Sequence, residues 1–245
     1  MKGVVLAGGL ATRLRPLTLV TNKHLLPVYH QPMIYYALEA MKKAGIKEVL
    51  LTSSPDHAGH FANLLASGED FNIKLYYAIQ KNPKGGIPQA IALAREFAKN
   101  DAILVILGDN IFSYDLSESV KRYNKSDGGA VVFGVNKDTQ SKQYGVIEID
   151  GDGRVLSIEE KPEYPKSTIA QTGIYIYDRH VFDYISELKP SARGELEVTD
   201  LNNIYLSKSQ LRCEIISWWV DAGTSFDELL LANNEVARMV KDGKL

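Results

Sequence analysis

Two glycines and three basic side chains near the start of the chain are the first residues whose types and spacing could do chemistry. Gly8 and Gly9 follow a short apolar run, and Arg13, Arg15 and Lys23 come after them. Glycines allow backbone N–H groups to converge on an anion, and nearby cations neutralise the charge that the backbone leaves. This order is typical of a loop that holds a polyphosphate. Its spacing fits neither the dinucleotide fingerprint nor the P-loop.

Two aspartates that lie far apart in the sequence could hold a hard cation. Asp109 comes two residues after the apolar run AILVIL, and Asp221 lies in the segment WWVDAGT. Mg²⁺ needs only one or two protein carboxylates when phosphate oxygens and water complete its shell. The alternative is structural: Asp109 would start a turn, and Asp221 would start a turn or cap the last helix. For that cap, Thr224 is the stronger candidate.

Two further cations could meet a second phosphate. Lys161 follows Glu160 at the end of a predicted strand, and Arg193 precedes a glycine in PSARGELE. Glu160 could accept sugar hydroxyls beside them, although both segments could equally be solvated surface. Gln80 and the loop PKGGIPQ follow another predicted strand. They could read the edge of a base through an amide side chain and a backbone N–H.

The apolar pattern predicts the elements that must position these residues. Residues 4–6, 47–52, 73–79 and 102–107 are predicted strands, and they alternate with helices predicted at 33–44, 57–66 and 89–98. Such alternation indicates parallel βαβ units. Later strands are predicted at 130–135, 145–149, 154–158 and 170–177, and later helices at 179–188, 200–208 and 225–240. The sequence predicts an α/β fold with a Rossmann-like, doubly wound, mixed but mainly parallel sheet, helices on both faces and a β-rich second half.

Ligands of such sheets bind beyond the carboxyl ends of the strands, which is where Gly8 and Asp109 fall. The 245 residues contain no linker-like segment, so we predict one domain, 1–245. Within it, 1–112 would be a nucleotide-binding half, 113–222 a half that binds the sugar phosphate, and 223–245 a C-terminal helix.

Composition excludes several function classes. The formal net charge is −2, which argues against sequence-independent binding to nucleic acid or to an acidic membrane. No signal peptide or long apolar run is apparent, so a cytoplasmic protein is expected. The single cysteine, Cys213, excludes an internal disulfide and a cysteine-based zinc cluster. His57 and His60 could share a helix face, but no third metal ligand is apparent, and we expect a solvent-facing pair.

Taken in order, these segments closely resemble the glucose-1-phosphate thymidylyltransferases, or dTDP-glucose pyrophosphorylases, of the sugar-nucleotidyltransferase family, in a short form. The resemblance extends over nearly the whole chain, and its most specific part is KPSARGELEVTD with its spacing to DAGT. The matching segments are LAGGLATRLRPLT, NKHLLPVY, QPMIYYALEAM, LGDNIF, YGVIEID, IEEKP, QTGIYIYD, KPSARGELEVTDLNNIYL and WWVDAGT.

That resemblance implies a Mg²⁺-dependent reaction in which dTTP and α-D-glucose 1-phosphate give dTDP-glucose and pyrophosphate. The sugar phosphate oxygen would attack the α-phosphorus in line, a step that asks the protein mainly for positioning and cations. By this resemblance, Arg13 neutralises the departing pyrophosphate and Lys23 the reacting phosphates. Mg²⁺ is held by Asp109 and Asp221, and the sugar phosphate is oriented by Lys161 and Arg193. The nucleotide is held by Leu6, Gly8, Gly9, Gln80, Gly85, Gly86 and Asp109, and the sugar pocket is lined by Tyr144, Gly145, Glu160, Lys161, Thr172, Tyr175 and Trp219.

The chain departs from the family pattern in two places. Its base-reading loop is one residue longer than Q-P-x-P-x-G-L-A-Q-A, with Pro88 where alanine is usual. This leaves open which of Gly85 and Gly86 reads the base, and it loosens the preference for thymine over uracil. Many relatives also continue further and use that tail in an effector site between subunits. Feedback inhibition at such a site is therefore not expected in this chain.

Three alternatives remain at this point. A uridylyltransferase, or an enzyme for another sugar 1-phosphate, would share the scaffold. An inactive nucleotide-sugar sensor is disfavoured because Arg13, Lys23, Asp109, Lys161 and Asp221 are all present. An NAD-binding oxidoreductase lacks its fingerprint. The resemblance further implies a homo-oligomer, dimer or tetramer, and a product destined for dTDP-L-rhamnose or another deoxysugar.

Overall fold

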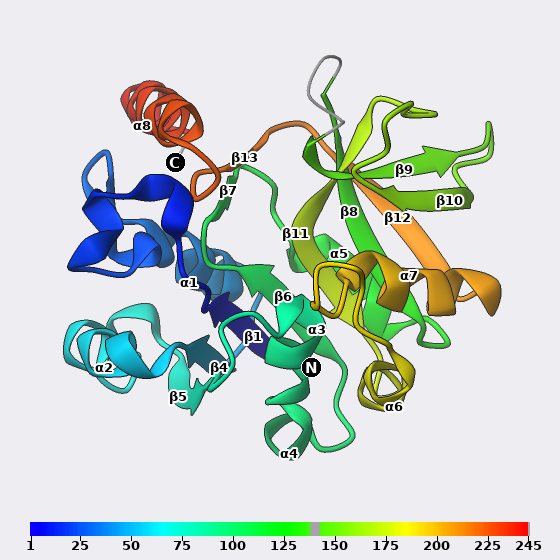
Figure 1. Cartoon of the computed structure of the whole chain (residues 1–245), viewed down its shortest axis with the longest axis horizontal. Coiled ribbons are helices and arrows are strands. Elements are labelled where there is room, and N and C mark those ends of the chain that lie inside the picture. Colours follow the sequence, from blue (N-terminus) through cyan, green and yellow to red (C-terminus); the bar gives the residue numbers. More distant parts are fainter. Residues whose placement is uncertain (138–142, 245) are drawn as a thin grey trace.

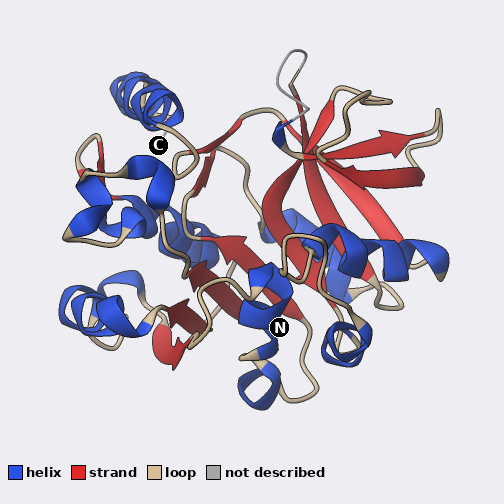
Figure 2. Cartoon of the chain, viewed as in Figure 1, coloured by secondary structure: helices blue, strands red, loops and turns tan. Residues whose placement is uncertain are grey.

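The structure is a computed structural model that describes residues 1–137 and 143–244. Residues 138–142 and 245, which fall in the predicted second half and terminal helix, lie outside the described part. Within the described ranges, nine strands form one sheet in the order β10-β9-β11-β6-β1-β4-β5, with β8 beside β11 and β12 beside β8 (Figure 1). Figure 2 shows this sheet crossing the whole molecule, with helices on either side.

The strands are β1 (Lys2–Ala7), β2 (Pro27–Val28), β3 (Gln31–Pro32), β4 (Glu48–Ser53), β5 (Lys74–Ile79), β6 (Ile103–Leu107), β7 (Asn110–Phe112), β8 (Ala130–Asn136), β9 (Gly145–Ile149), β10 (Val155–Glu160), β11 (Ile169–Tyr177), β12 (Leu211–Ile216) and β13 (Trp219–Asp221). The helices are α1 (Met33–Lys43), α2 (Ala58–Leu65), α3 (Gly86–Ala92), α4 (Arg95–Ala98), α5 (Ser117–Asn124), α6 (Val181–Glu187), α7 (Val198–Ser207) and α8 (Phe226–Lys241).

Alternation along β1 explains why helices cover both faces of the sheet. β1 pairs in parallel with β4 and with β6. Val5 and Ala7 point into a core that includes Leu38 of α1, whereas Val4 and Leu6 belong to the opposite core. Successive strand residues face opposite sides, so an apolar strand of this kind must be covered twice. The predicted doubly wound, mixed sheet is confirmed.

One predicted helix, residues 89–98, is wrong in its bounds. The helix starts earlier, as α3 at Gly86, and a break separates it from the short α4. Pro88 lies in the first turn of α3, where a missing N–H costs nothing. At the break, the Ala94 N–H donates to the Ile91 carbonyl at 2.9 Å, an i to i−3 bond that tightens the turn and ends the α-helical ladder.

The sheet forks at β11, and this fork opens the second half of the molecule. Ala170 pairs with Val146 of β9, whereas Ile174 pairs with Ile106 of β6. Between these pairs, the Gly173 N–H donates to the side chain of Asn110 at 2.7 Å instead of to a strand. β11 therefore leaves a gap between β9 and β6 that side chains from other elements line.

A second short sheet brings the end of the chain back to the first half. β13 pairs antiparallel with β7, and neither strand was predicted, nor was α5. α8, red in Figure 1, packs its Ala232 and Val236 against Leu14 and Met33 of the first half. Ser225 caps this helix by accepting the Glu228 N–H at 3.1 Å, so the prediction of Thr224 as the cap is wrong. Ser225 has the extended backbone that an N-cap requires.

Among the described residues, no helix is both long enough and apolar enough to cross a membrane. A boundary between the two halves near residue 112 stays a prediction.

Candidate active site

Two adjoining cavities lie at the carboxyl ends of β1 and β6 and in the fork of β11. The first, the glycine-loop cavity, has a volume of about 760 Å³ and is lined by Leu6, Gly8 and Gly9. The second, the fork cavity, has a volume of about 890 Å³ and is lined by Tyr144 and Thr172 among others. Both are lined by Arg13, Lys23, Gly86, Ile87, Leu107, Arg193, Glu195, Asp221 and Thr224.

Within the described part of the chain, every predicted site residue except Gly85 lines one of these cavities. Leu6, Gly8, Gly9, Gln80 and Asp109 line the glycine-loop cavity. Tyr144, Gly145, Glu160, Lys161, Thr172, Tyr175 and Trp219 line the fork cavity. Arg13, Lys23, Gly86, Arg193 and Asp221 line both. The arrangement brings the predicted residues together, while their individual roles stay predictions.

The glycine loop leaves no room for a side chain at its first glycine. A Cβ on Gly8 would lie 2.5 Å from Oε1 of Gln80, which is buried at the end of β5. Gly9 has φ +92°, in the left-handed region that favours glycine. The bare backbone of the loop is therefore open to the cavity and could approach a phosphate closely.

Asn22 fixes the turn that presents Lys23. Its amide nitrogen donates to the Ala7 carbonyl at 3.2 Å, which ties the turn to the end of β1. Its Oδ1 accepts the His24 N–H at 2.9 Å and lies 2.6 Å from the His24 ring nitrogen. Burial, and then the charge of Lys23, lower the pKa of His24 to about 3. The ring is therefore neutral at physiological pH and supports the turn rather than adding a charge.

The pairing of β7 with β13 brings the two aspartates together. Asp221 lies opposite Asn110 in the ladder, and the Ala222 N–H donates to the Asp109 carbonyl at 2.9 Å. Lys23 forms an ion pair with Asp109. Burial opposes the charge on Asp109, but Lys23 outweighs it and holds the pKa of this carboxyl well below its usual range. Asp109 is therefore ionised.

Asp221 is in the opposite electrostatic situation. Burial, and then the neighbouring charge of Asp109, raise its pKa to about 7. Its Oδ1 accepts the Gly223 N–H at 3.1 Å. For Lys23, burial disfavours the ammonium ion, but Asp109 and Asp221 outweigh it and raise its pKa. The charge of Asp109 thus disfavours ionisation of Asp221, and a further cation beside the two carboxylates would favour it.

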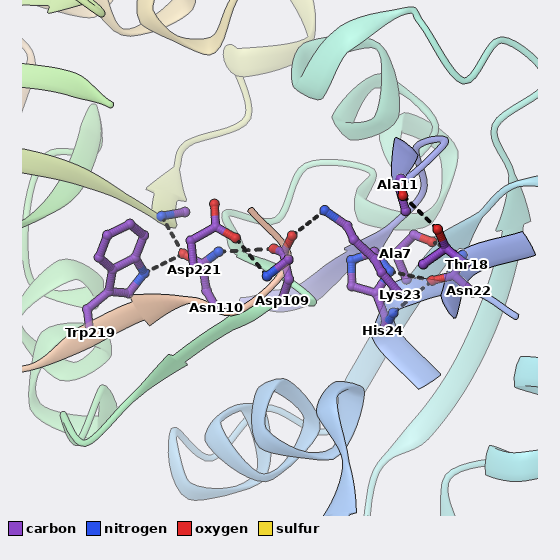
Figure 3. Close-up of polar contacts among 12 residues, drawn as sticks. Ala7, Ala11, Thr18, Asn22, Lys23, His24, Asp109, Asn110, Trp219 and Asp221 are labelled. Atoms are coloured by element: carbon purple, nitrogen blue, oxygen red, sulfur yellow. Dashed lines mark hydrogen bonds and ion pairs between the residues drawn. The ribbon is translucent and has the colours of Figure 1, made fainter. Parts of the chain in front are cut away.

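Asn110 connects the aspartates to the fork cavity. Its Nδ2 donates to Asp109 at 3.1 Å, and its Oδ1 accepts from Trp219 Nε1 at 2.5 Å and from the Gly173 N–H at 2.7 Å. Figure 3 shows this line of contacts running from Trp219 through Asn110 and Asp109 to Lys23. Asn110 is buried, so these contacts fix the orientation of the Asp109 carboxylate.

The fork cavity also holds the second pair of cations. Lys161 Nζ and Arg193 Nη2 lie 3.5 and 3.6 Å from the same oxygen, Glu160 Oε1. Glu160 Oε2 accepts from the Thr199 hydroxyl at 2.7 Å. Arg193 also bonds Glu197 through Nε at 3.2 Å and Nη2 at 2.8 Å. The two cations are exposed in the cavity, where an anion could meet both.

Aromatic side chains form the remaining wall of the fork cavity. The rings of Tyr144 and Trp219 meet edge to face, with centroids 5.1 Å apart. The Thr172 hydroxyl donates to the Phe133 carbonyl at 2.8 Å, so it holds β11 against β8. Gly145, which also lines this cavity, pairs with Glu160 in the ladder of β9 and β10. An aromatic wall beside a carboxylate is well suited to the apolar faces and hydroxyl rim of a sugar.

The structure distinguishes the two glycines of the predicted base-reading loop. Gly86 lines both cavities and has φ +84°, whereas Gly85 lines neither. The Gly85 carbonyl accepts the Leu196 N–H at 3.3 Å, which joins this loop to the segment that carries Arg193. Gln80 Nε2 lies 3.5 Å from the Gly86 carbonyl. The backbone of Gly85 thus serves this joint, and a role for Gly85 in binding the base stays a prediction.

Sequence reasoning missed several polar residues that line the fork cavity, among them Asn110, Gln171 and Glu197. Glu197 could have been found from its i, i+4 spacing to Arg193. Gln171 lies four residues before Tyr175, and strand alternation places both on one face. Asn110 carried no local signal, because its partners are far away in the sequence.

The donor set fits a hard divalent cation that a substrate helps to bind. No group of three or more His, Cys, Asp or Glu side chains within residues 1–137 and 143–244 could hold a metal by itself. Asp109 and Asp221 offer carboxylate oxygens at the junction of the two cavities. Mg²⁺ commonly uses one or two carboxylates together with phosphate oxygens. The pair suits such an ion.

Comparisons with known proteins agree with this geometry. The chain is 44% identical over 241 residues to a glucose-1-phosphate thymidylyltransferase of Mycolicibacterium smegmatis, which covers 96% of this chain and 82% of the relative. It is 44% identical over 229 residues to the enzyme of that name from Neisseria gonorrhoeae, and the match covers 91% of this chain and 78% of that relative. A third relative of that name, from Mycobacterium tuberculosis, is 41% identical over 235 residues, covering 94% and 80%.

Two solved structures share the fold. A Bacillus anthracis protein described as a candidate glucose-1-phosphate thymidylyltransferase, in complex with sucrose, has a TM-score of 0.90 and 46% identity, covering 96% of this chain and 94% of that one. A UDP-glucose pyrophosphorylase complexed with UDP-glucose has a TM-score of 0.84 and 25% identity, covering 97% and 98%. A family model described as nucleotidyl transferase matches residues 2–238. The chain is therefore a nucleotidyltransferase and belongs to this family.

Proposed function

We propose that this enzyme transfers a thymidylyl group from dTTP to α-D-glucose 1-phosphate, giving dTDP-glucose and pyrophosphate. The observation that carries the proposal is the meeting of two cavities at Lys23 and Asp221. One cavity has a bare glycine loop for a polyphosphate, and the other has a carboxylate, two cations and an aromatic wall for a sugar phosphate. The relatives of about 43% identity that bear the name of this reaction support the choice of substrates.

In this proposal, the chain's residues align two anions and stabilise charge. An oxygen of the sugar phosphate attacks the α-phosphorus of dTTP, and the bond from that phosphorus to the bridging oxygen breaks as pyrophosphate leaves. Lys161 and Arg193 hold the sugar phosphate for in-line attack. Lys23 lies at the junction, where charge accumulates on the reacting phosphates. Arg13 lines both cavities and faces the departing pyrophosphate.

Mg²⁺ would be held by Asp109 and Asp221, and when bound it would neutralise charge on the phosphate oxygens. Asn110 would keep the Asp109 carboxylate in place through its contacts with Gly173 and Trp219. Asp221 would have to be ionised, which a divalent cation favours.

The nucleoside would lie in the glycine-loop cavity, with Gln80 and the backbone of Gly86 at the base. These two groups would not distinguish thymine from uracil. Because the loop is longer than in the family pattern and contains Pro88, a uridylyltransferase is the second candidate. Initial rates of pyrophosphate release with dTTP and UTP, each with several sugar 1-phosphates, test the proposal. We expect dTTP with glucose 1-phosphate to be the preferred pair, and a clear preference for UTP would refute the thymidylyl assignment.

A dimer or tetramer is a further prediction that the resemblance supports, and a cytoplasmic location is one drawn from the sequence pattern. Sedimentation velocity measures the first directly. The destination of the product, dTDP-L-rhamnose or another deoxysugar, depends on partner enzymes.

A further inference from the structure

A buried line of hydrogen bonds runs from helix α7 to the wall of the fork cavity. The Tyr177 hydroxyl donates to Asn202 Oδ1 at 2.7 Å, and Asn202 Nδ2 donates to Gln171 Oε1 at 3.3 Å. Gln171 Nε2 then donates to the Tyr175 hydroxyl oxygen at 3.3 Å. All four side chains are buried, so their orientations are fixed by these contacts.

This line ends at the fork in β11, where the predicted sugar site lies. Gln171 and Tyr175 line the fork cavity, and Gln171 follows the last residue of β11 that pairs with β9. A Cβ built on Gly145 would lie 3.4 Å from the Cβ of Gln171 and 3.5 Å from Glu160 Oε2. Gln171 therefore lies at the same end of the cavity as Glu160.

The direction of the hydrogen bonds leaves specific groups available at the cavity. A glutamine amide has two N–H donors and two carbonyl lone pairs, and among the described residues Gln171 uses one of each. The Tyr175 hydroxyl accepts from Gln171 and keeps its own proton for another acceptor. Burial raises the pKa of Tyr175, so that proton stays in place. One N–H, one lone pair and one O–H thus remain for a ligand.

We propose that Gln171 selects the sugar 1-phosphate by hydrogen bonding to a hydroxyl of its pyranose ring, and that Asn202 is the residue that positions Gln171. The inference rests on the proposed function, because it assigns the fork cavity to the sugar. Ring hydroxyls both donate and accept, which matches what Gln171 and Tyr175 retain. A site built to bond a hydroxyl discriminates against the analogue that lacks it, because buried polar groups are then left unpaired.

The test is a substitution combined with a set of substrates. Gln171→Met keeps the length of the side chain and removes its polar atoms. Rates are measured at saturating dTTP with glucose 1-phosphate and with its 2-, 3-, 4- and 6-deoxy analogues. We expect Q171M to lose about tenfold in kcat/KM for glucose 1-phosphate with an unchanged KM for dTTP. For one deoxy analogue alone, the one that lacks the hydroxyl bound by Gln171, the wild type and Q171M should have the same kcat/KM.

Asn202→Ala tests the positioning role. It should reproduce the same selective loss, and it should add nothing when combined with Q171M, because both act on one hydroxyl. Asn203→Ala is the matched control. Asn203 is the next residue of α7, but its amide donates to the Ile158 carbonyl at 3.2 Å, away from Gln171. This variant should behave as the wild type with all five sugars.

The inference is wrong if Q171M changes kcat/KM equally for all five sugars, or for none, or if N202A and Q171M are additive. Should Q171M fail to fold, Gln171→Asn withdraws the amide by one methylene and is judged in the same way. Wild-type turnover of dTTP with glucose 1-phosphate is the separate test of the proposed function. If another pair of substrates is preferred, deoxy analogues of that sugar phosphate replace the five. If no turnover is seen, the affinities of the wild type and Q171M for the same sugar phosphates are measured by calorimetry and judged in the same way.

Discussion

Gly86 offers a direct test of how the loop that follows β5 is joined to the segment that carries Arg193. It has φ +84°, and an added Cβ would lie 2.1 Å from the Leu196 carbonyl oxygen. A non-glycine residue in this region costs roughly 1–2 kcal/mol. Moving Leu196 aside would also break its N–H bond to the Gly85 carbonyl at 3.3 Å, a loss of about 1 kcal/mol. Together these contributions predict that Gly86→Ala lowers the free energy of unfolding by roughly 2–3 kcal/mol.

In a chain of this size, that change lowers the melting temperature by roughly 4–12 °C. Because the same movement displaces Arg193, kcat/KM for the sugar phosphate should fall by about tenfold to a hundredfold. Calorimetry and initial rates measure the two effects. Gly59→Ala is the control: Gly59 lies in α2 with nothing within 4 Å of an added Cβ, so this variant should be as stable as the wild type or slightly more so. A G86A variant within 1 °C and twofold of the wild type would refute the reasoning.

Three further predictions follow from the aspartates and the single thiol. Asp109→Asn should abolish pyrophosphate release while the circular dichroism spectrum is unchanged, and near-normal release would exclude the metal role. Asp221 has a pKa of about 7 when folded and about 4 when unfolded, so its contribution to the free energy of unfolding should fall as pH rises from 4 to 7, whereas the contribution of His24, whose pKa is lowered, rises over much of that range; the difference between wild type and an Asp221 variant isolates the first contribution. Asp221→Asn should therefore be inactive yet about 2–4 kcal/mol more stable than the wild type in urea at pH 8, with a smaller difference at pH 5; equal stability at pH 8 would contradict this. Burial, and then Glu214, raise the pKa of the Cys213 thiol to about 12. Iodoacetamide at pH 8 should therefore modify the folded protein more than a hundredfold more slowly than the unfolded protein. Comparable rates would show an accessible thiolate and contradict this prediction.

The parts of the fold that could be predicted depend on neighbours in the sequence. The apolar run that forms β6 and the helical spacing of α1 are local patterns, and both elements appear as expected. The bounds of α3 and the N-cap of α8 depend on backbone geometry. Thr224 and Ser225 are adjacent and both could cap a helix, so the sequence alone does not show which of them does.

The parts of the site that could not be predicted depend on strand register. Asn110 bonds Trp219 across 109 residues of chain, and that contact exists only because β7 pairs with β13. Gln171 faces the cavity only because β11 changes partners after Ala170. Residue types predicted which chemistry was available, and the pairing of distant strands determined which atoms face the substrate cavities.

The most direct measurement of the central claim is ³¹P NMR of dTTP and glucose 1-phosphate incubated with the purified enzyme and MgCl₂. We predict equal amounts of dTDP-glucose and pyrophosphate, with no product when MgCl₂ is omitted or when Asp109→Asn replaces the wild type. Hydrolysis of dTTP without transfer to the sugar, or no reaction with dTTP while UTP is consumed, would contradict that claim.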